Sequence, residues 1–127
     1  MRIQSSPSLS ALSTLATSFQ VTANNIANVN TNEFKASAAR FETGPMDQGV
    51  QISEIRKDGS PGAYVQTLVF TEENGKAMQR PGWVESSNTD IAREFVNMIS
   101  TERAFQANVA SIRTADEMLG AILDTTA

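Results

Sequence analysis

The stretch IAREFVNMISTERAFQANVASIRTADEMLGAIL, residues 91–123, decides the fold. Apolar side chains recur along it at alternating spacings of four and three, which is the heptad pattern of a helix packed on other helices. Because no proline interrupts the stretch, it predicts one helix from about Thr89 to Leu123, roughly 50 Å long at 1.5 Å per residue. The apolar seam of this helix, which we predict to be an assembly interface, is Ile91, Phe95, Met98, Phe105, Val109, Ile112, Leu119 and Leu123.

The start of this helix is signalled by Ser87-Asn88-Thr89-Asp90. Short polar side chains cap helix N-termini, and an acid in the first turn suits the helix dipole. Glu102 and Asp116 interrupt the seam. We expect both at its exposed edge, with pairing across chains as the alternative.

A second helical pattern lies near the N-terminus, with Ser8 as its expected cap. This helix is about 20 residues long and can cover only part of the C-terminal seam. The remainder therefore needs another partner, which we expect to be another chain. The N-terminal seam, also predicted to be an assembly interface, is Leu9, Leu12, Ala16, Phe19, Ala23 and Ile26.

The N-terminal helix carries unusually little charge. From Met1 to Asn32 the only charged side chain is that of Arg2, and Ser, Thr, Gln and Asn occupy the positions off the seam. Such a surface can lie against protein on several sides, because little charge has to be desolvated. This favours burial between subunits, although a core helix of a small bundle remains an alternative.

The segment between the helices has a different character. An Asn-rich run, residues 24–32, predicts a turn, because asparagine side chains compete for backbone hydrogen bonds. Farther on, Val50 and Ile52 alternate with polar residues, and residues 63–71 read as a strand. Asn74-Gly75 predicts a hairpin turn, with a returning strand that ends at Pro81-Gly82. We expect one small antiparallel β element here.

Together these patterns predict a mainly α fold, in which long N- and C-terminal helices pack as a coiled-coil-like pair around a small antiparallel β element. The expected segments are 1–35 (helix and Asn-rich turn), 36–86 (β and loop) and 87–127 (long helix).

Composition excludes several classes of function. The 127 residues include no histidine and no cysteine, which removes the commonest general base and the commonest metal ligands. Carboxylate-only metal sites and an enzyme built on carboxylates remain alternatives, but nothing in the spacing suggests either. We therefore expect no enzyme, no cofactor, no metal site and no small-molecule substrate. A net charge of −4 argues against nucleic-acid binding. No apolar run is long enough to span a membrane, and the first residues lack the apolar core of a cleaved signal peptide.

The two ends of the chain resemble the axial proteins of the bacterial flagellum, the rod and hook family. The N-terminal resemblance rests on ANNIANVNT, residues 23–31, followed by Phe34-Lys35. The C-terminal resemblance rests on VESSNTDI, residues 84–91, then VNMI at 96–99 and RAFQAN at 103–108. It continues through Ile112, Thr114 and 116–119. One departure is Glu33, where the family has Gly or a small residue. A positive φ there would cost about 1 kcal/mol or more.

The resemblance implies a structural subunit of the basal-body rod, a periplasm-spanning drive shaft assembled from the terminal helices. The short middle segment is most similar to a proximal-rod protein of the FlgC type. The implied partners are copies of the chain, other rod proteins and the flagellar type III export apparatus, which would export it without a cleaved signal peptide. The alternatives are a distal-rod or hook-type axial protein and a helical adaptor.

Overall fold

A computed structural model describes residues 7–126. Two helices frame four strands: α1 is Pro7–Ala27 and α2 is Ile91–Thr126. Strands β1 (Ser37–Thr43) and β2 (Val50–Lys57) form one antiparallel hairpin, with a 3-10 turn, η1 (Pro45–Asp47), at its tip. Strands β3 (Tyr64–Glu73) and β4 (Lys76–Glu85) form a second hairpin, which is not paired with the first.

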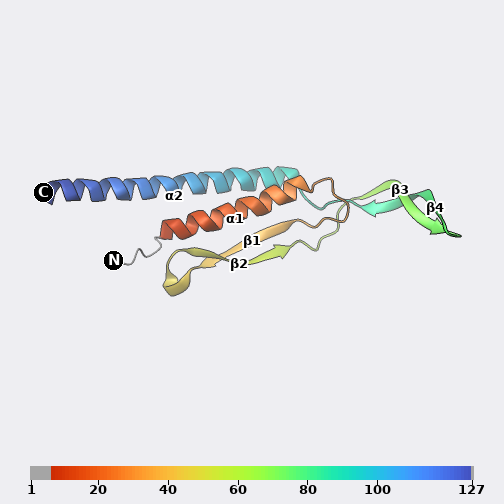
Figure 1. The fold of residues 1–127 in the computed structure, drawn as a ribbon, viewed down its shortest axis with the longest axis horizontal. Coiled ribbons are helices and arrows are strands. Elements are labelled where there is room, and N and C mark those ends of the chain that lie inside the picture. The colour runs from red at the N-terminus through yellow and green to blue at the C-terminus, as the bar shows by residue number, and fades with distance from the viewer. Residues whose placement is uncertain (1–6, 127) are drawn as a thin grey trace.

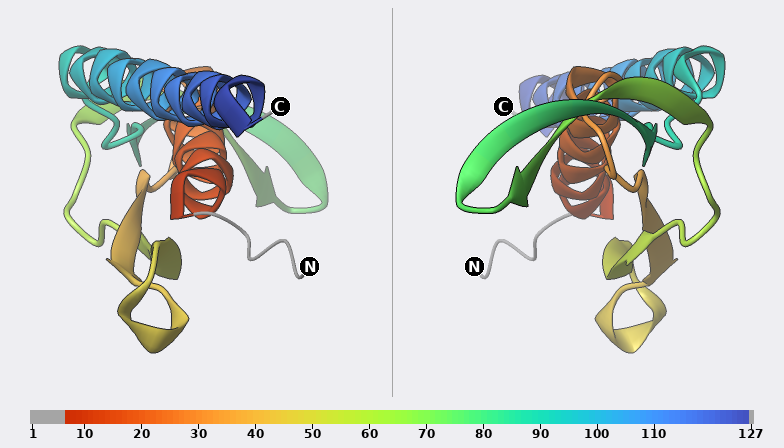
Figure 2. Two further views of the ribbon diagram at one scale, coloured as in Figure 1. Left: turned by 90° about the vertical axis from the view of Figure 1, so that its left-hand side faces the viewer. Right: turned by 90° about the vertical axis from the view of Figure 1, so that its right-hand side faces the viewer.

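The molecule is elongated, with all elements roughly along one axis (Figure 1). Helix α1 lies antiparallel to α2 and contacts the β1–β2 hairpin on its other side, so that it forms a middle layer (Figure 2). The β3–β4 hairpin projects from the end where α2 begins, beyond both helices (Figure 1). The C-terminal end of α2 extends beyond α1 in the opposite direction (Figure 1).

The prediction of a mainly α fold is wrong. Helices hold 50% of the described residues and strands hold 29%. The single small β element is in fact two separate two-stranded sheets. The two terminal helices flank this β-rich middle.

Strand β1 escaped prediction because its sequence, SAARFET, is poor in the β-branched and aromatic residues that favour strands. It pairs with β2 from Ser37↔Lys57 to Thr43↔Val50, with a bulge after Arg40. Residues 58–63 therefore link two separate hairpins. Neighbouring elements hold β1 in place, as described below, so that its local propensity matters less.

The second hairpin follows its turn signal. Asn74 and Gly75 both adopt positive φ, 55° and 73°, as a two-residue hairpin turn requires. The expected strand end at Pro81-Gly82 is wrong, because β4 continues to Glu85 and Pro81 pairs with Leu68. Every strand of a two-stranded sheet is an edge strand, where a proline is tolerated.

The helix ends follow simple capping rules. Helix α1 begins at Pro7, a residue favoured at the first helical position. Ser8 therefore lies inside the helix, and its expected capping role is wrong. At α2 the Asp90 Oδ1 atom accepts hydrogen bonds from the N–H groups of Ala92 and Arg93, at 3.1 and 3.3 Å. Asp90 thus caps the helix from just outside its first turn.

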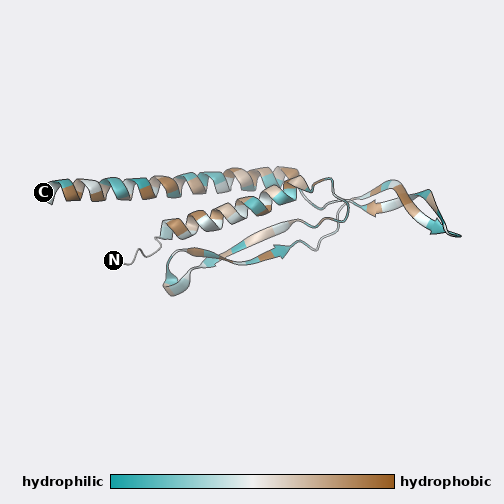
Figure 3. Ribbon diagram, in the orientation of Figure 1, coloured by the Kyte–Doolittle hydropathy of each residue, from teal (hydrophilic) through white to brown (hydrophobic). Residues whose placement is uncertain are grey.

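The described chain has no apolar core. Its buried side chains with polar groups are Thr14, Thr22, Asn25 and Glu94, and no hydrophobic residue among 7–126 is buried. Apolar residues instead lie along α2 and over the β3–β4 hairpin, in contact with solvent (Figure 3). Because burial of apolar surface is the main favourable term in folding, this arrangement lacks the usual source of stability for a chain of this size.

Candidate assembly interface

None of the predicted interface positions on α1 is buried. Leu9 and Phe19 are exposed, as is Ala16, whereas Leu12, Ala23 and Ile26 are half-buried. The more buried positions of α1 carry polar groups that bind the first hairpin. Ser10 Oγ accepts a hydrogen bond from Val50 N (3.2 Å), and Thr14 Oγ1 donates one to Val50 O (3.1 Å). Part of the uncharged polar face thus lies against its own chain.

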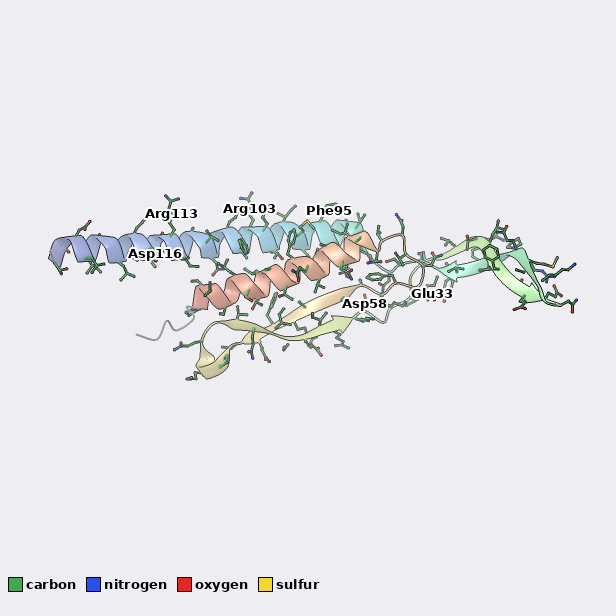
Figure 4. All side chains as sticks on the ribbon, viewed as in Figure 1. Glu33, Asp58, Phe95, Arg103, Arg113 and Asp116 are labelled. Atoms are coloured by element: carbon green, nitrogen blue, oxygen red, sulfur yellow. The ribbon has the colours of Figure 1, made fainter. Side chains whose placement is uncertain are left out.

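The predicted seam of α2 is rotated away from α1. Two of its members, Met98 and Ile112, belong to the face with least exposure, whereas Ile91, Phe95, Phe105 and Val109 are exposed beside it. Arg103 and Arg113 project from the side of α2 away from α1 (Figure 4). The positions of α2 that are not exposed recur at spacings of three and four and lie on one side of the helix; they are Glu94, Met98, Thr101, Ala104, Asn108 and Ile112.

An apolar notch brings three predicted positions together. Ala16 and Phe19 of α1 and Phe105 of α2 line a cavity of about 360 Å³ between the helices. Leu15, Gln20, Thr101 and Glu102 complete its lining. Gln106 Nε2 donates a hydrogen bond to Glu102 Oε1 at 3.0 Å, so this carboxylate is partnered at the edge of the notch. The notch is the size of a few side chains and is open to a neighbouring molecule.

Beyond Ile112, every described residue of α2 is exposed. Helix α1 has 21 residues and α2 has 36, so α1 is too short to cover the whole of its partner. Leu119 and Leu123 lie in the uncovered part, with 59% and 69% of their surfaces exposed. Helix α1 therefore covers only part of the length of α2, as its predicted length implied.

A polar junction connects the helices to both hairpins, and we define it as Asn25, Lys35, Asp58, Glu85 and Asn88. Asn25 is its most buried member, with 1% of its surface exposed. Its amide donates to Ser37 O (2.7 Å) and accepts from Ser37 N (2.8 Å). The side chain therefore binds the start of β1 as a neighbouring strand would, and satisfies two backbone groups.

Asn88 binds two segments from the middle of the chain. Its Oδ1 accepts from Ala36 N at 2.7 Å, and its Nδ2 donates to the carbonyl oxygens of Asp58 (3.0 Å) and Ser60 (2.9 Å). Asp58 N in turn donates to Ala36 O at 2.8 Å. The sequence predicted only a turn for the Asn-rich run 24–32 and a helix start for Ser87-Asn88-Thr89-Asp90, so the binding roles of Asn25 and Asn88 were not predicted. The high number of asparagines in the run 24–32 was the feature of the sequence that could have indicated such binding.

An ion pair closes the junction at the base of β4. Lys35 Nζ donates to Glu85 Oε1, and also to Ser60 O at 2.8 Å. The same carboxylate oxygen accepts from Gly62 N at 2.7 Å. The hydrogen bonds from Lys35 and from Gly62 lower the pKa of Glu85. Hydrogen bonds from Ser60 likewise lower the pKa of Asp58. Gly62 has no room for a side chain, because a Cβ there would lie 2.0 Å from Ser86 O.

Glu33 adopts the left-handed backbone that its position suggested, with φ at 61°. Its N–H donates to Glu85 O at 2.9 Å, which ties this strained turn to the end of β4. Glu33 and Asp58 both lie where the helices meet the hairpins (Figure 4). The residue is strained because its Cβ approaches the following carbonyl group in this conformation.

The described residues include neither a metal-binding cluster nor a membrane-spanning helix. Within 7–126, no group of three acidic side chains is arranged to hold a metal ion. No helix in this range is long and apolar enough to cross a membrane. Exposed apolar side chains form stripes on the surface, and the buried polar side-chain atoms of the described residues all have hydrogen-bond partners. Such a surface suits association with another protein.

Comparison with known families matches both ends of the chain. Residues 8–35 match the family described as flagella basal body rod protein, and residues 80–125 match the C-terminal family of flagellar basal body rod FlgEFG proteins. The first match contains Asn25 and Lys35, and the second contains Glu85 and Asn88. The matched segments therefore meet at the polar junction.

Among curated proteins, a flagellar basal-body rod protein FlgC from Yersinia enterocolitica is 31% identical over 120 residues, which cover 87% of this chain and 86% of that protein. This chain belongs to the flagellar basal-body rod protein family. The rod protein FlgG from Buchnera aphidicola of Schizaphis graminum is 50% identical over 46 residues. A hook protein FlgE from Caulobacter vibrioides is 32% identical over 77 residues.

The coverage of these relatives differs. The chain spans 18% of the length of that FlgG protein and 13% of that FlgE protein. A second Buchnera FlgG, from the Acyrthosiphon pisum symbiont, is matched over 24% of its length. The chain is thus similar to proteins of all three types, and the FlgC relative from Yersinia enterocolitica resembles it along nearly its whole length.

Proposed function

We propose that the chain is a structural subunit of the proximal part of the flagellar basal-body rod. Its terminal helices pack with those of neighbouring subunits into a stiff tube that transmits torque. The predicted seam residues of α1 and α2 form the contacts, with Phe19, Phe95, Phe105 and Leu119 as the largest contributors. The partners are copies of the chain and other rod proteins, and the type III export apparatus during secretion.

One observation carries this proposal: the described chain buries no hydrophobic residue of its own. Burying one large apolar side chain stabilises a folded or assembled state by about 1.5–3 kcal/mol. The exposed apolar side chains of α1 and α2 can therefore stabilise the molecule only when a neighbouring subunit covers them. An exposed apolar surface of this extent marks an interaction site. A helix that extends beyond the helix packed on it also suits a repeating assembly.

The proximal position is supported by the coverage of the relatives. The FlgC relative is matched over most of both chains, whereas the FlgG and FlgE relatives share only portions with it. A distal-rod or hook-type subunit is the alternative within the family. The role is mechanical and the chain has no catalytic function, which agrees with the absence of histidine and cysteine.

Deletion of the gene in its own organism tests the proposal. We expect loss of motility and of complete rods, with both restored by the wild-type gene. A tagged copy should co-purify with isolated basal bodies. Motile deletion cells with intact rods would contradict the proposal.

The helical adaptor predicts a different solution state. Size-exclusion chromatography with light scattering and circular dichroism of the purified chain separates the two hypotheses. A rod subunit should be a monomer with incomplete helix content before assembly, because its helices lack a core. A discrete, fully helical dimer would favour the adaptor.

A further inference from the structure

A polar cavity lies where α1, β1 and α2 come together, and its volume is about 340 Å³. Thr22 of α1 and Ala38 of β1 contribute to its lining, and Glu94 and Asn97 contribute from α2. The cavity shares Thr101 with the apolar notch, but it lies on the side of the helix pair that faces the first hairpin. All three layers of the molecule therefore form this one cavity, which we call the Glu94 cavity.

Glu94 is a charged residue with only 7% of its surface exposed. Within residues 7–126 its carboxylate takes part in no hydrogen bond or ion pair, although every fully enclosed side-chain polar atom in this range has a partner. Its oxygen atoms are therefore not enclosed by protein, and they face the space of the cavity that Glu94 lines. A carboxylate so nearly buried is unfavourable unless a cation or hydrogen-bond donors reach it.

The charges that line the Glu94 cavity do not cancel. Asp58 and Arg93 line it as well, so two acids face one base. Hydrogen bonds from Ser60 are the main cause of the lowered pKa of Asp58, and the positive charge of Arg93 contributes to it. Arg93 is thus close enough to compensate Asp58, which leaves the charge of Glu94 without compensation. An arginine side chain would fit this need, because it carries one positive charge and several hydrogen-bond donors.

Helix α2 itself carries an arginine that has no acidic partner. Of its three arginines, Arg93 lines the cavity and Arg113 pairs with Glu117 at 3.1 Å. Arg103 is exposed, projects from the side of α2 away from α1 (Figure 4), and forms no ion pair within the part of the chain that the structure describes. Nine residues, or about two and a half turns, separate Glu94 from Arg103, so the two side chains lie on opposite sides of α2.

We propose that the Arg103 side chain of one subunit enters the Glu94 cavity of a second copy of the chain. Opposite charge favours this occupant, and a guanidinium group can donate two parallel hydrogen bonds to a carboxylate. The two groups cannot meet within one chain, because they lie on opposite sides of the same helix. Each copy therefore offers its cavity to one neighbour and its arginine to another.

Such a contact joins two different surfaces, head to tail. Contacts of this kind propagate as rings or open helical rows, so this inference rests on the proposed function and names one of its contacts. Where α2 helices of neighbouring copies run in the same direction, the pairing displaces them by nine residues, or about 14 Å at 1.5 Å per residue. The ion pair therefore sets the register between copies, as charged pairs in interfaces often do.

Cysteine cross-linking in isolated basal bodies tests this register, because the chain has no cysteine of its own. Asn97 and Ala107 are exposed and lie three and four residues beyond Glu94 and Arg103. Cells would produce Asn97→Cys and Ala107→Cys as two chains with different tags, and their basal bodies would be treated with a short bismaleimide. In the matched control, Ala121→Cys replaces Ala107→Cys on the same side of α2. We expect at least about tenfold more cross-linked dimer from the first pair, because the control is about 21 Å out of register at 1.5 Å per residue.

Charge variants, each produced as the sole copy of the chain, test the pairing itself. Arg103→Gln covers the cavity without supplying a cation, so the Glu94 carboxylate loses its remaining water and gains no partner. The amount of chain in basal bodies, relative to whole cells, should fall at least about tenfold, because an uncompensated buried charge is strongly unfavourable. Adding Glu94→Gln to the same chain should restore most of it, since neither amide is charged. Arg113→Gln is the matched control, because the exposed ion pair that it breaks contributes little.

Each outcome decides the inference, and cross-linking keeps both charges, so it decides even where a charge variant fails to fold. Equal dimer yields from the two cysteine pairs, or no dimer while both chains are present in the basal bodies, would overturn it and leave the proposed function standing. So would losses that multiply in the double variant, or a loss with Glu94→Gln but none with Arg103→Gln, which would assign the cavity to a cation from another protein. Absence of the wild-type chain from basal bodies, measured by immunoblot, would refute the proposed function and this inference together.

Discussion

Truncating Phe105 to alanine should weaken incorporation into the rod. The Phe105 side chain lines the notch between the helices and keeps 39% of its surface exposed in the single chain. A phenylalanine buries about 150–250 Å² when fully covered, so covering the remainder removes about 60–100 Å² from water. At about 25 cal/mol per Å², this stabilises the assembly by about 1.5–2.5 kcal/mol per subunit.

That free energy corresponds to about a 10- to 60-fold loss in association constant for Phe105→Ala, since 1.4 kcal/mol is a factor of ten. Competition measures it directly. Wild-type and variant chains with different tags would be produced in one cell, and their ratio in isolated basal bodies would be compared with their ratio in whole cells. The whole-cell ratio corrects for any loss of the variant before assembly.

Val96→Ala is the matched control, because Val96 is an exposed apolar residue of α2 outside the predicted seam. We expect its ratio in basal bodies to stay close to its ratio in cells. If Phe105→Ala is incorporated as well as the wild type, the seam has been assigned to the wrong face of α2. If both variants fail equally, the contact surface is wider than the seam.

Three further predictions concern the polar junction and the turn beside it. Glu33→Gly should raise the free energy of unfolding, measured by urea denaturation, by about 1 kcal/mol, because glycine removes the strain of the left-handed backbone. Glu33→Ala keeps a Cβ atom and should not raise it. Equal effects of the two substitutions would show that Glu33 is not strained. Asn25→Ala should lower the free energy of unfolding by about 1–3 kcal/mol for each Ser37 backbone group that loses its partner, and the amides of β1 should exchange faster. Asn24→Ala, at an exposed position, is the control and should leave the amides of β1 protected from exchange. The lowered pKa of Glu85 means that its bonds to Lys35 and Gly62 stabilise the folded chain above the ordinary value of 4.5 and are lost as pH falls through the lowered pKa. The protection of the Gly62 amide against hydrogen exchange, relative to an unprotected amide at the same pH, should therefore fall in acid. Glu85→Gln should abolish that pH dependence, and an unchanged dependence would assign it to another group.

Much of the helical frame could be predicted from the sequence because its signals are local. The apolar pattern of α2 repeats over more than thirty residues, and the long helix that it predicts is present in the structure, with Asp90 as its cap. Comparison with the family pattern singled out Glu33 as a position where a positive φ would be costly, and the structure shows that φ is positive there. Asn74-Gly75 likewise set the second hairpin, because few other pairs suit both turn positions.

The errors arose where tertiary contacts override local preference. Nothing in SAARFET predicts a strand, yet Asn25 holds the start of β1 by two hydrogen bonds from another element. Pro81-Gly82 ends strands in most settings, but an edge strand tolerates it. The face of α2 that meets α1 was also misjudged, because Glu94 and Thr101 lie there beside Met98. A helix face that carries polar residues cannot be recognised as an inner face from the spacing of apolar residues alone.

Electron cryo-microscopy of isolated basal bodies tests the central claim most directly. The account predicts that this chain lies in the proximal rod with α1 and α2 in the wall of the tube, and that a neighbouring subunit fills the notch at Phe19 and Phe105. It also predicts contact between chains along α2 beyond Ile112. A rod that lacks the chain, or one in which the seam of α2 faces solvent, would contradict it.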